Sequence, residues 1–305
     1  MSRVDDLITT ALKRLPPRPP DGPGQQKLKK RYSELMSQVV AAALAEELRQ
    51  RGLKQARPGG DGELGSSGAE RRMSGGIGAK KVDVTWATEE SGLILAISVK
   101  CITSKDPKTG NYQKNLINRR GDMLGEAVTL HRRFPYATLG GFMLFDKGAA
   151  EDGSEQRSST FVNAHRAFRI FTGRSDPAGR DEQLEQLFLA LVEATQFQCS
   201  VRVTHAGDPD TTLSLDQAID RLLKTVAERD PDMYALVGPN GEIEPTLDAT
   251  PLSLARMKSS GVIVKGKAPR TVKKNKNRKA AELPPLSLDL PLPDDEDGEE
   301  SDDEE

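Results

Sequence analysis

The chain has 305 residues, of which 30% are charged and 36% hydrophobic, and this composition suggests that part of it builds no core. Its net charge of −2 hides two blocks of opposite sign: residues 265–279 carry +8 and residues 282–305 carry −12. Blocks of this kind are typical of solvated, disordered tails, and we expect no fold in either. No apolar run approaches the roughly 20 residues of a membrane span, and no signal peptide is recognisable. Cys101 and Cys199 form no CxxC pair, so we expect a cytoplasmic protein.

The N-terminal region predicts two helices. Apolar residues recur at helical spacing over residues 4–15, and the proline-rich run 16–20 ends that pattern. Residues 27–51 carry a longer apolar stripe, and Gly52 ends it. Residues 54–78 are rich in Gly, Ser and Arg without any period, which predicts a loop that is either mobile or ordered by a ligand.

A β-hairpin is predicted next. Residues 82–86 and 94–99 are rich in β-branched and apolar residues, and the polar stretch 88–92 between them suits a hairpin loop. Side chains two positions apart on a strand share a face. Ser98 and Lys100 therefore share one face of the second strand, and Asp83 on the first strand can point to the same side.

A loop at residues 103–110 and a helix at residues 111–134 follow the hairpin. The polar face of this helix has acidic and basic residues that line up at helical spacing: Arg119, Asp122, Glu126 and Arg133. Such a face describes either a functional surface or a solvated surface with salt bridges.

The remaining pattern completes an α/β order. Residues 137–145 read as a buried strand, and helices are predicted at 161–171, 181–195 and 213–229 around a strand at 198–204. This order predicts a mixed sheet covered by helices.

We expect three parts in the chain. Residues 1–24 hold the N-terminal helix and a proline-rich linker, and residues 25–230 form the α/β domain. Residues 231–305 hold a linker, the basic block and the acidic tail, for which we expect little folded structure.

The hairpin and its surroundings resemble the PD-(D/E)xK nuclease superfamily, whose members have a restriction-endonuclease-like fold. Asp83 on one strand is followed, after 14 intervening residues, by the tripeptide Ser98-Val99-Lys100 on the next. A helix bearing the acid Glu34 precedes this hairpin, and the helix at 111–134 follows it, as in that family. The resemblance covers residues 27–145.

One position departs from the family pattern: the second carboxylate should stand at position 98, where this chain has Ser98. Some restriction enzymes of the superfamily carry serine there and supply the acid from the following helix. By this resemblance, Glu126 or Asp122 would supply it here. If neither reaches the site, the chain is an inactive relative.

The resemblance implies a metal-dependent hydrolase that cuts phosphodiester bonds in DNA, with Mg²⁺ or Mn²⁺ as cofactor. Asp83 and Glu126 would hold the ion, with Asp122 as the other candidate, and Glu34 would hold a second ion or position the lysine. Lys100 would orient the attacking water and offset charge on the phosphate. Ser98 would stand beside these groups in the catalytic motif.

The nucleic acid contacts expected from the residues lie before the hairpin and at the start of the following helix, where side chains can donate to phosphates or bases. The candidates are Arg71, Arg72, Lys80, Lys81, Gln113, Asn115, Asn118, Arg119 and Arg120.

The sequence thus favours a DNA endonuclease of a restriction-modification or other defence system. A second copy of the chain and a methyltransferase are partners that such a role allows. Two alternatives stay open: a nuclease fold without catalysis that binds DNA or assists assembly, and a scaffold or adaptor unrelated to nucleic acid.

Overall fold

The structure is a computed structural model, and it describes residues 2–22, 24–59, 71–88, 91–195, 199–238 and 241–246. The basic and acidic blocks near the C-terminus lie outside these ranges. Within them, no helix is long and apolar enough to cross a membrane.

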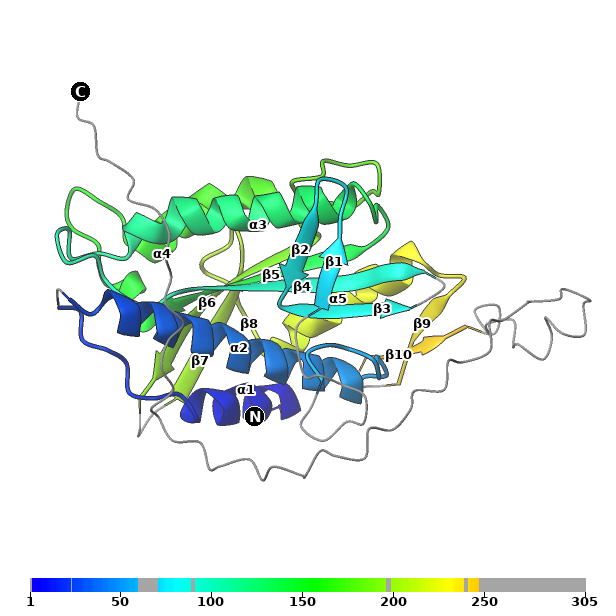
Figure 1. The fold of residues 1–305 in the computed structure, drawn as a ribbon, viewed down its shortest axis with the longest axis horizontal. Coiled ribbons are helices and arrows are strands. Elements are labelled where there is room, and N and C mark those ends of the chain that lie inside the picture. Colours follow the sequence, from blue (N-terminus) through cyan, green and yellow to red (C-terminus); the bar gives the residue numbers. More distant parts are fainter. Residues whose placement is uncertain are drawn as a thin grey trace, which may run out of the picture. The chain divides into compact units, whose positions relative to one another are not determined.

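A mixed six-stranded sheet forms the centre of the fold (Figure 1). Its strands are, in spatial order, β3 (Val84–Thr88), β4 (Gly92–Ile102), β5 (Thr138–Asp146), β6 (Gln186–Ala194), β7 (Cys199–His205) and β8 (Thr212–Leu213). The pairs β4–β5 and β5–β6 are parallel, whereas the outer pairs are antiparallel. Parallel central strands covered on both faces read as continuous apolar runs, which explains the buried stretch of β5.

Helices cover both faces of this sheet. On one face α1 (Arg3–Lys13), α2 (Gln26–Gln50) and α5 (Leu215–Arg229) share a core with the sheet. On the other, α3 (Leu116–His131) and α4 (Thr160–Phe168) build a second core. Three short 3₁₀ helices are η1 (Gln113–Asn115), η2 (Lys147–Ala150) and η3 (Arg169–Phe171). The predicted α/β class, a mixed sheet flanked by helices, is therefore confirmed.

Two glycines let these helices pack closely on β5. A Cβ on Gly140 would lie 2.8 Å from Leu222 of α5, and one on Gly141 would overlap Met123 of α3. Contacts this short are essentially never seen for real side chains, so the pair of glycines fixes how near both layers lie.

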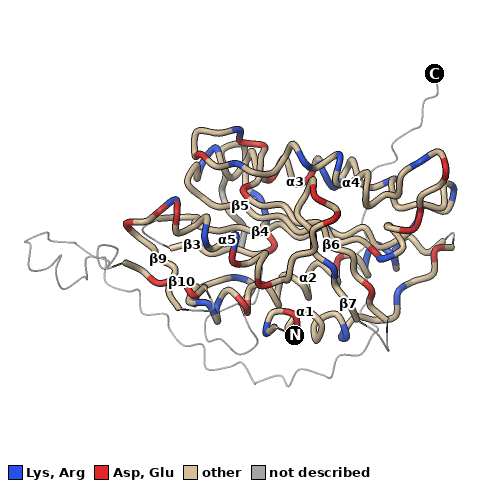
Figure 2. The backbone as a smooth tube through the Cα atoms, turned by 180° about the vertical axis from the view of Figure 1, so that it is seen from behind, with Lys and Arg blue, Asp and Glu red and all other residues tan. Residues whose placement is uncertain are grey.

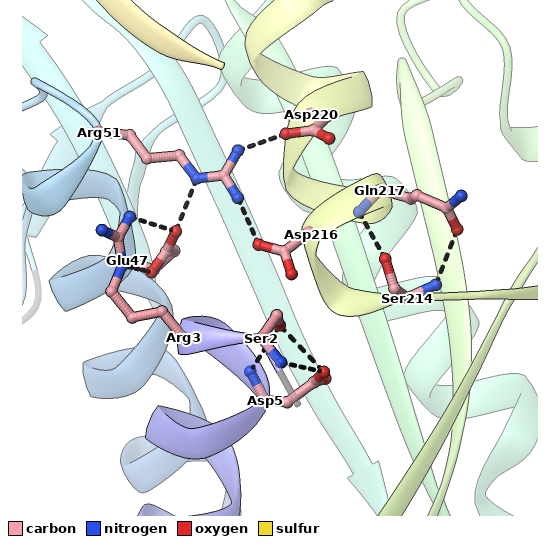
Figure 3. Close-up of polar contacts among 9 residues, drawn as sticks. All are labelled: Ser2, Arg3, Asp5, Glu47, Arg51, Ser214, Asp216, Gln217 and Asp220. Carbon is pink, nitrogen blue, oxygen red and sulfur yellow. Dashed lines mark hydrogen bonds and ion pairs between the residues drawn. The ribbon is translucent and has the colours of Figure 1, made fainter. Parts of the chain in front are cut away.

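A charged network centred on the buried Glu47 and Arg51 ties α1, α2 and α5 together (Figure 3). Arg51 is almost fully buried and donates to Glu47 at 2.6 Å, to Asp216 at 2.7 Å, and to Asp220. Arg3 of α1 also donates to Glu47, through two nitrogens at 2.9 Å. Burial raises the pKa of Glu47, but the hydrogen bonds and charges of the two arginines outweigh this and hold it below its usual value.

The structure differs from the sequence-based interpretation at both ends of the domain. Helix α1 buries Val4, Ile8 and Leu12 in the same core as α2, so it belongs to the domain and not to a separate segment. Beyond residue 230, β9 (Tyr234–Val237) and β10 (Glu242–Pro245) form an antiparallel hairpin. The ring of Tyr234 packs edge-on against Trp86 at 5.1 Å, which extends ordered structure past the expected limit.

The helix predicted at residues 181–195 is wrong, because Gln186–Ala194 forms the central strand β6. Its residues, QLFLALVEA, are mostly good helix formers and include one β-branched side chain. Six consecutive residues of the strand are buried, since β5 and β7 pair with it and both faces are covered. Tertiary packing overrides the local preference here.

A second antiparallel hairpin, β1 (Arg71–Ser74) with β2 (Ala79–Val82), stands beside α3 (Figure 1). At its turn, the Gly76 amide donates to the Thr129 carbonyl of α3 at 2.8 Å. A Cβ on Gly76 would lie 2.5 Å from Arg132 Cβ, and one on Gly75 would overlap Thr129. These glycines anchor the turn on α3, so the later part of the expected loop at 54–78 is ordered by the protein's own helix.

We expect protein stability to fall below pH 6.5 because of His165. Burial lowers the pKa of His165 to about 4. The Gly207 amide donates to its Nδ1 at 3.2 Å, so the folded ring is neutral. The unfolded histidine takes up a proton near pH 6.5, so its stabilising contribution is complete above that pH and is lost as pH falls towards 4. This loss amounts to about 3 kcal/mol.

Urea unfolding at several pH values, with His165→Gln as the comparison, measures this effect. The free energies of unfolding of the two proteins should converge by about 3 kcal/mol between pH 7 and pH 4. A constant difference between them across that range would show that His165 does not cause the loss.

Candidate functional site

Asp83 lies at the bend between β2 and β3, where the backbone of the next strand holds its carboxylate. The antiparallel register pairs Val84 with Ile97, which brings Asp83 level with Ser98 of β4. The amide of Val99 donates to Asp83 Oδ2 at 2.7 Å. The carboxylate is therefore fixed by the sheet itself, and 17% of the side chain is exposed.

Lys100 projects from β4 toward the α3 layer. Its neighbours Val99 and Cys101 belong to the core on the α2 side, so alternation along the strand sends Ser98 and Lys100 to the other face. The Lys100 ammonium lies 3.3 Å from Asp83 Oδ2 and 2.8 Å from Glu126 Oε1, and 15% of the side chain is exposed.

Glu126 comes from α3, beside the residues that this helix buries against the sheet. Met123, Ala127 and Leu130 are buried in that core, and they lie within one turn of Glu126 on the helix. The Glu126 side chain is consequently only 13% exposed. The structure thus brings Asp83, Ser98, Lys100 and Glu126 together, although 25 residues separate Lys100 from Glu126 along the chain.

Burial and charge oppose each other at these groups. Burial lowers the pKa of Lys100, but the charges of Glu126 and Asp83 outweigh it and raise that pKa above its usual value. The pKa of Glu126 is raised, mainly by burial, against the opposing effects of Lys100 and of the nearby Ser98 hydroxyl. The two directions differ in meaning: the carboxylates stabilise the charge of Lys100, whereas burial disfavours the charge of Glu126.

Two polar atoms in the site are buried without a hydrogen-bond partner: Ser98 Oγ and Glu126 Oε2. No hydrogen bond of regular geometry joins them, although the Ser98 hydroxyl lies near enough to lower the pKa of Glu126. Leaving a buried polar atom without a partner costs free energy, so such atoms indicate a place for a ligand, an ion or a water.

The arrangement offers oxygen ligands to a hard cation. Mg²⁺ is usually held by one or two carboxylates and otherwise keeps its waters, and Asp83 and Glu126 provide that number. Within the described ranges, no group of three or more His, Cys, Asp or Glu residues is placed to hold a metal ion. Any ion at this site would have two protein carboxylates and would take the rest of its shell from water or substrate.

The structure does not bring two of the candidate metal ligands to the site. Asp122 has a side chain that is 50% exposed, and it forms a salt bridge with Arg119 at 3.2 Å on the surface of α3. Glu34 is exposed on α2, whose neighbouring Ser33 and Ser37 contact Thr103 and Cys101 on the opposite face of β4. Glu34 and Lys100 therefore lie on different sides of the sheet.

The candidate nucleic acid contacts fall into two groups, one on the β1–β2 hairpin and one on η1 and the first turn of α3. Lys80 and Lys81 are exposed on β2, while Arg71 and Arg72 lie on the paired strand β1, where only their backbone is described. Figure 2 also shows Lys and Arg residues, in blue, along the part of the chain labelled α3 and α4.

The other candidates are at the start of α3. Asn115 and Asn118 are exposed, and Arg119 forms the salt bridge with Asp122. Gln113 accepts a hydrogen bond from Asn163 of α4 at 3.1 Å, and the Arg120 guanidinium lies 5.8 Å from the centre of the Phe171 ring. Of these, the Arg119 guanidinium already has an anionic partner, with which a phosphate would have to compete.

The β1–β2 hairpin connects Asp83 to α3, a link that the sequence did not predict. Asp83 directly follows β2, and the turn of this hairpin is fastened to α3 three residues beyond Glu126, at Thr129. The only signal was the pair Gly75-Gly76, which allows that close approach.

Comparison with protein-family models, with curated proteins and with solved structures found no match to this chain.

Proposed function

We propose that this protein is a Mg²⁺-dependent endonuclease that hydrolyses phosphodiester bonds in DNA, with a restriction-endonuclease-like domain. One observation carries the proposal: a lysine on a central strand contacts two carboxylates, one at the neighbouring strand and one on the following helix, at 3.3 Å and 2.8 Å. This set of charges suits the hydrolysis of a phosphodiester, for which a cation must be held close to a water and a phosphate.

The residues present fit a divalent cation. Glu126 Oε2 is buried and lacks a partner, which is the condition that a bound cation would relieve. Asp83 and Glu126 would hold the ion, which would neutralise phosphate charge and lower the pKa of a bound water. Ser98 Oγ, which is also buried without a hydrogen-bond partner, lies near the Glu126 carboxylate.

The chain's own groups do the remaining work. Lys100 presents a compact positive charge that stabilises the charge developing on the phosphate and orients the attacking water. The Val99 amide keeps the Asp83 carboxylate in place throughout. Lys80 and Lys81 on β2 would hold the DNA backbone beside the site, with a salt-dependent affinity.

A second candidate is a DNA-binding module that has lost catalysis. It is favoured by the serine at position 98 and because, among the residues that the structure describes, two carboxylates and no third contact Lys100.

A plasmid cleavage assay separates these functions. We expect the purified protein to cut supercoiled DNA in Mg²⁺ and not in EDTA, and Asp83→Ala and Lys100→Ala to abolish cutting. Binding of DNA without any cutting would support the inactive module. A protein that does not bind DNA and does not cut it would reject both of these functions and favour a scaffold role.

A further inference from the structure

The two acids of the site share a counter-ion supplied by the protein. The side chains of Asp83, Lys100 and Glu126 are 17%, 15% and 13% exposed, so water screens these charges poorly. Two carboxylates held this close would repel each other strongly without a positive charge between them. The Lys100 ammonium, 3.3 Å from one and 2.8 Å from the other, supplies that charge.

A divalent cation would meet the same two carboxylates. Mg²⁺ binds carboxylate oxygens at about 2.1 Å, closer than an ammonium approaches them, and the two positive charges repel in a poorly screened site. The Lys100 ammonium and the metal ion therefore cannot both contact the two carboxylates closely at the same time. Hence the energy of binding a metal ion includes the energy of loosening Lys100 from its partners.

We propose that Lys100 is the resting counter-ion of this site and competes with the divalent cation for Asp83 and Glu126. This inference depends on the proposed function, because it assumes that the site takes a metal ion. The lysine keeps the protein folded without metal and keeps metal affinity low until substrate arrives.

Charge balance shows why substrate would change this. Two carboxylates and one ammonium sum to −1, and a divalent cation changes the sum to +1. One phosphodiester brings the total to zero and gives the Lys100 ammonium a new anionic partner. Metal and DNA should therefore bind cooperatively, each raising the affinity of the other.

Lys100→Met tests the competition, because it removes the charge and keeps an unbranched side chain. Without metal the variant should melt at a lower temperature than wild type, since its two carboxylates are left uncompensated. Mn²⁺ or Mg²⁺ should raise its melting temperature, whereas the wild-type value should change little. By calorimetry in the absence of DNA, Lys100→Met should bind Mn²⁺ at least about tenfold more tightly than wild type.

The double variant Lys100→Met/Glu126→Gln is the matched control, as it has one carboxylate left and should show no melting response to metal. If Lys100→Met folds only poorly, dialysis into Mn²⁺ should recover it. The proposal would be overturned if Lys100→Met bound Mn²⁺ no more tightly than wild type. It would also be overturned if Lys100→Met stayed unfolded in Mn²⁺ while the double variant folded. If the wild-type protein cuts DNA but Lys100→Met does not bind Mn²⁺ more tightly, the competition alone is rejected. If Lys100→Met binds Mn²⁺ more tightly but the wild-type protein does not cut DNA, the nuclease function alone is rejected.

Discussion

Glu126→Gln should reduce Mg²⁺-dependent DNA cleavage by about a thousandfold, comparable with the loss of a charge-stabilising group in other active sites. The amide keeps the size of the side chain but removes the negative charge that binds a hard cation. Because Glu126 contacts Lys100 at 2.8 Å, the substitution also leaves the ammonium with Asp83 alone. Single-turnover cleavage of a supercoiled plasmid measures the effect.

Asp122→Asn is the matched control, because Asp122 lies one turn earlier on the same helix and is half exposed. Its loss removes a surface ion pair with Arg119, which contributes less than about 1 kcal/mol to stability. We expect its cleavage rate to stay within a few-fold of wild type. Equal, severe losses in both variants would argue against the assignment of Glu126 as the ligand.

Glu185→Ala should lower the free energy of unfolding by about 3–5 kcal/mol, the range for breaking a buried ion pair from one side. Glu185 lies at the start of the β6 region with a fully buried side chain, 3.1 Å from Arg174, 2.7 Å from Arg229 and 3.3 Å from His131. Burial raises its pKa, but hydrogen bonding and charge from His131, with the charge of Arg229, lower it overall. Its removal would leave the buried Arg174 and Arg229 guanidinium groups without their shared carboxylate.

The Leu139 amide also donates to Glu185 at 2.6 Å, so the variant would lose a backbone contact at β5. Glu182→Ala is the matched control, since this neighbouring acid pairs with Arg180 at the surface and should cost under about 1 kcal/mol. Urea unfolding at neutral pH compares the two. A loss below about 1 kcal/mol in Glu185→Ala would show that the buried cluster does not stabilise the fold.

The local parts of the site follow from sequence pattern. A period of two places Ser98 and Lys100 on one strand face, and the hairpin places Asp83 beside them, as the register shows. Hydrophobic periodicity also predicts α1, α2 and α5 to within about two residues, because each buries one stripe against the sheet. The helix predicted at 111–134 is shorter, since α3 begins at Leu116 and ends at His131.

The missing carboxylate could not be chosen from the sequence by spacing alone. Asp122 and Glu126 are four residues apart on one helix, and both lie near arginines at salt-bridge spacing. The rotation of α3 on the sheet decides between them, and that rotation depends on Met123 packing against Gly141 across the core. A contact between distant residues carries no local signal.

Buried polar groups were the least predictable features. Glu185 falls within the helix predicted at residues 181–195. It is buried because β6 lies at the centre of the sheet, and the helix-favouring composition of that strand hides its position.

The central claim is that Glu126 supplies the carboxylate that position 98 lacks. The most direct test moves the carboxylate back to the strand, in the double variant Ser98→Asp/Glu126→Gln, and measures Mg²⁺-dependent plasmid cleavage beside Glu126→Gln alone. The double variant is predicted to cleave DNA at least about tenfold faster than Glu126→Gln alone. A folded, DNA-binding double variant that cuts no faster than Glu126→Gln would contradict it.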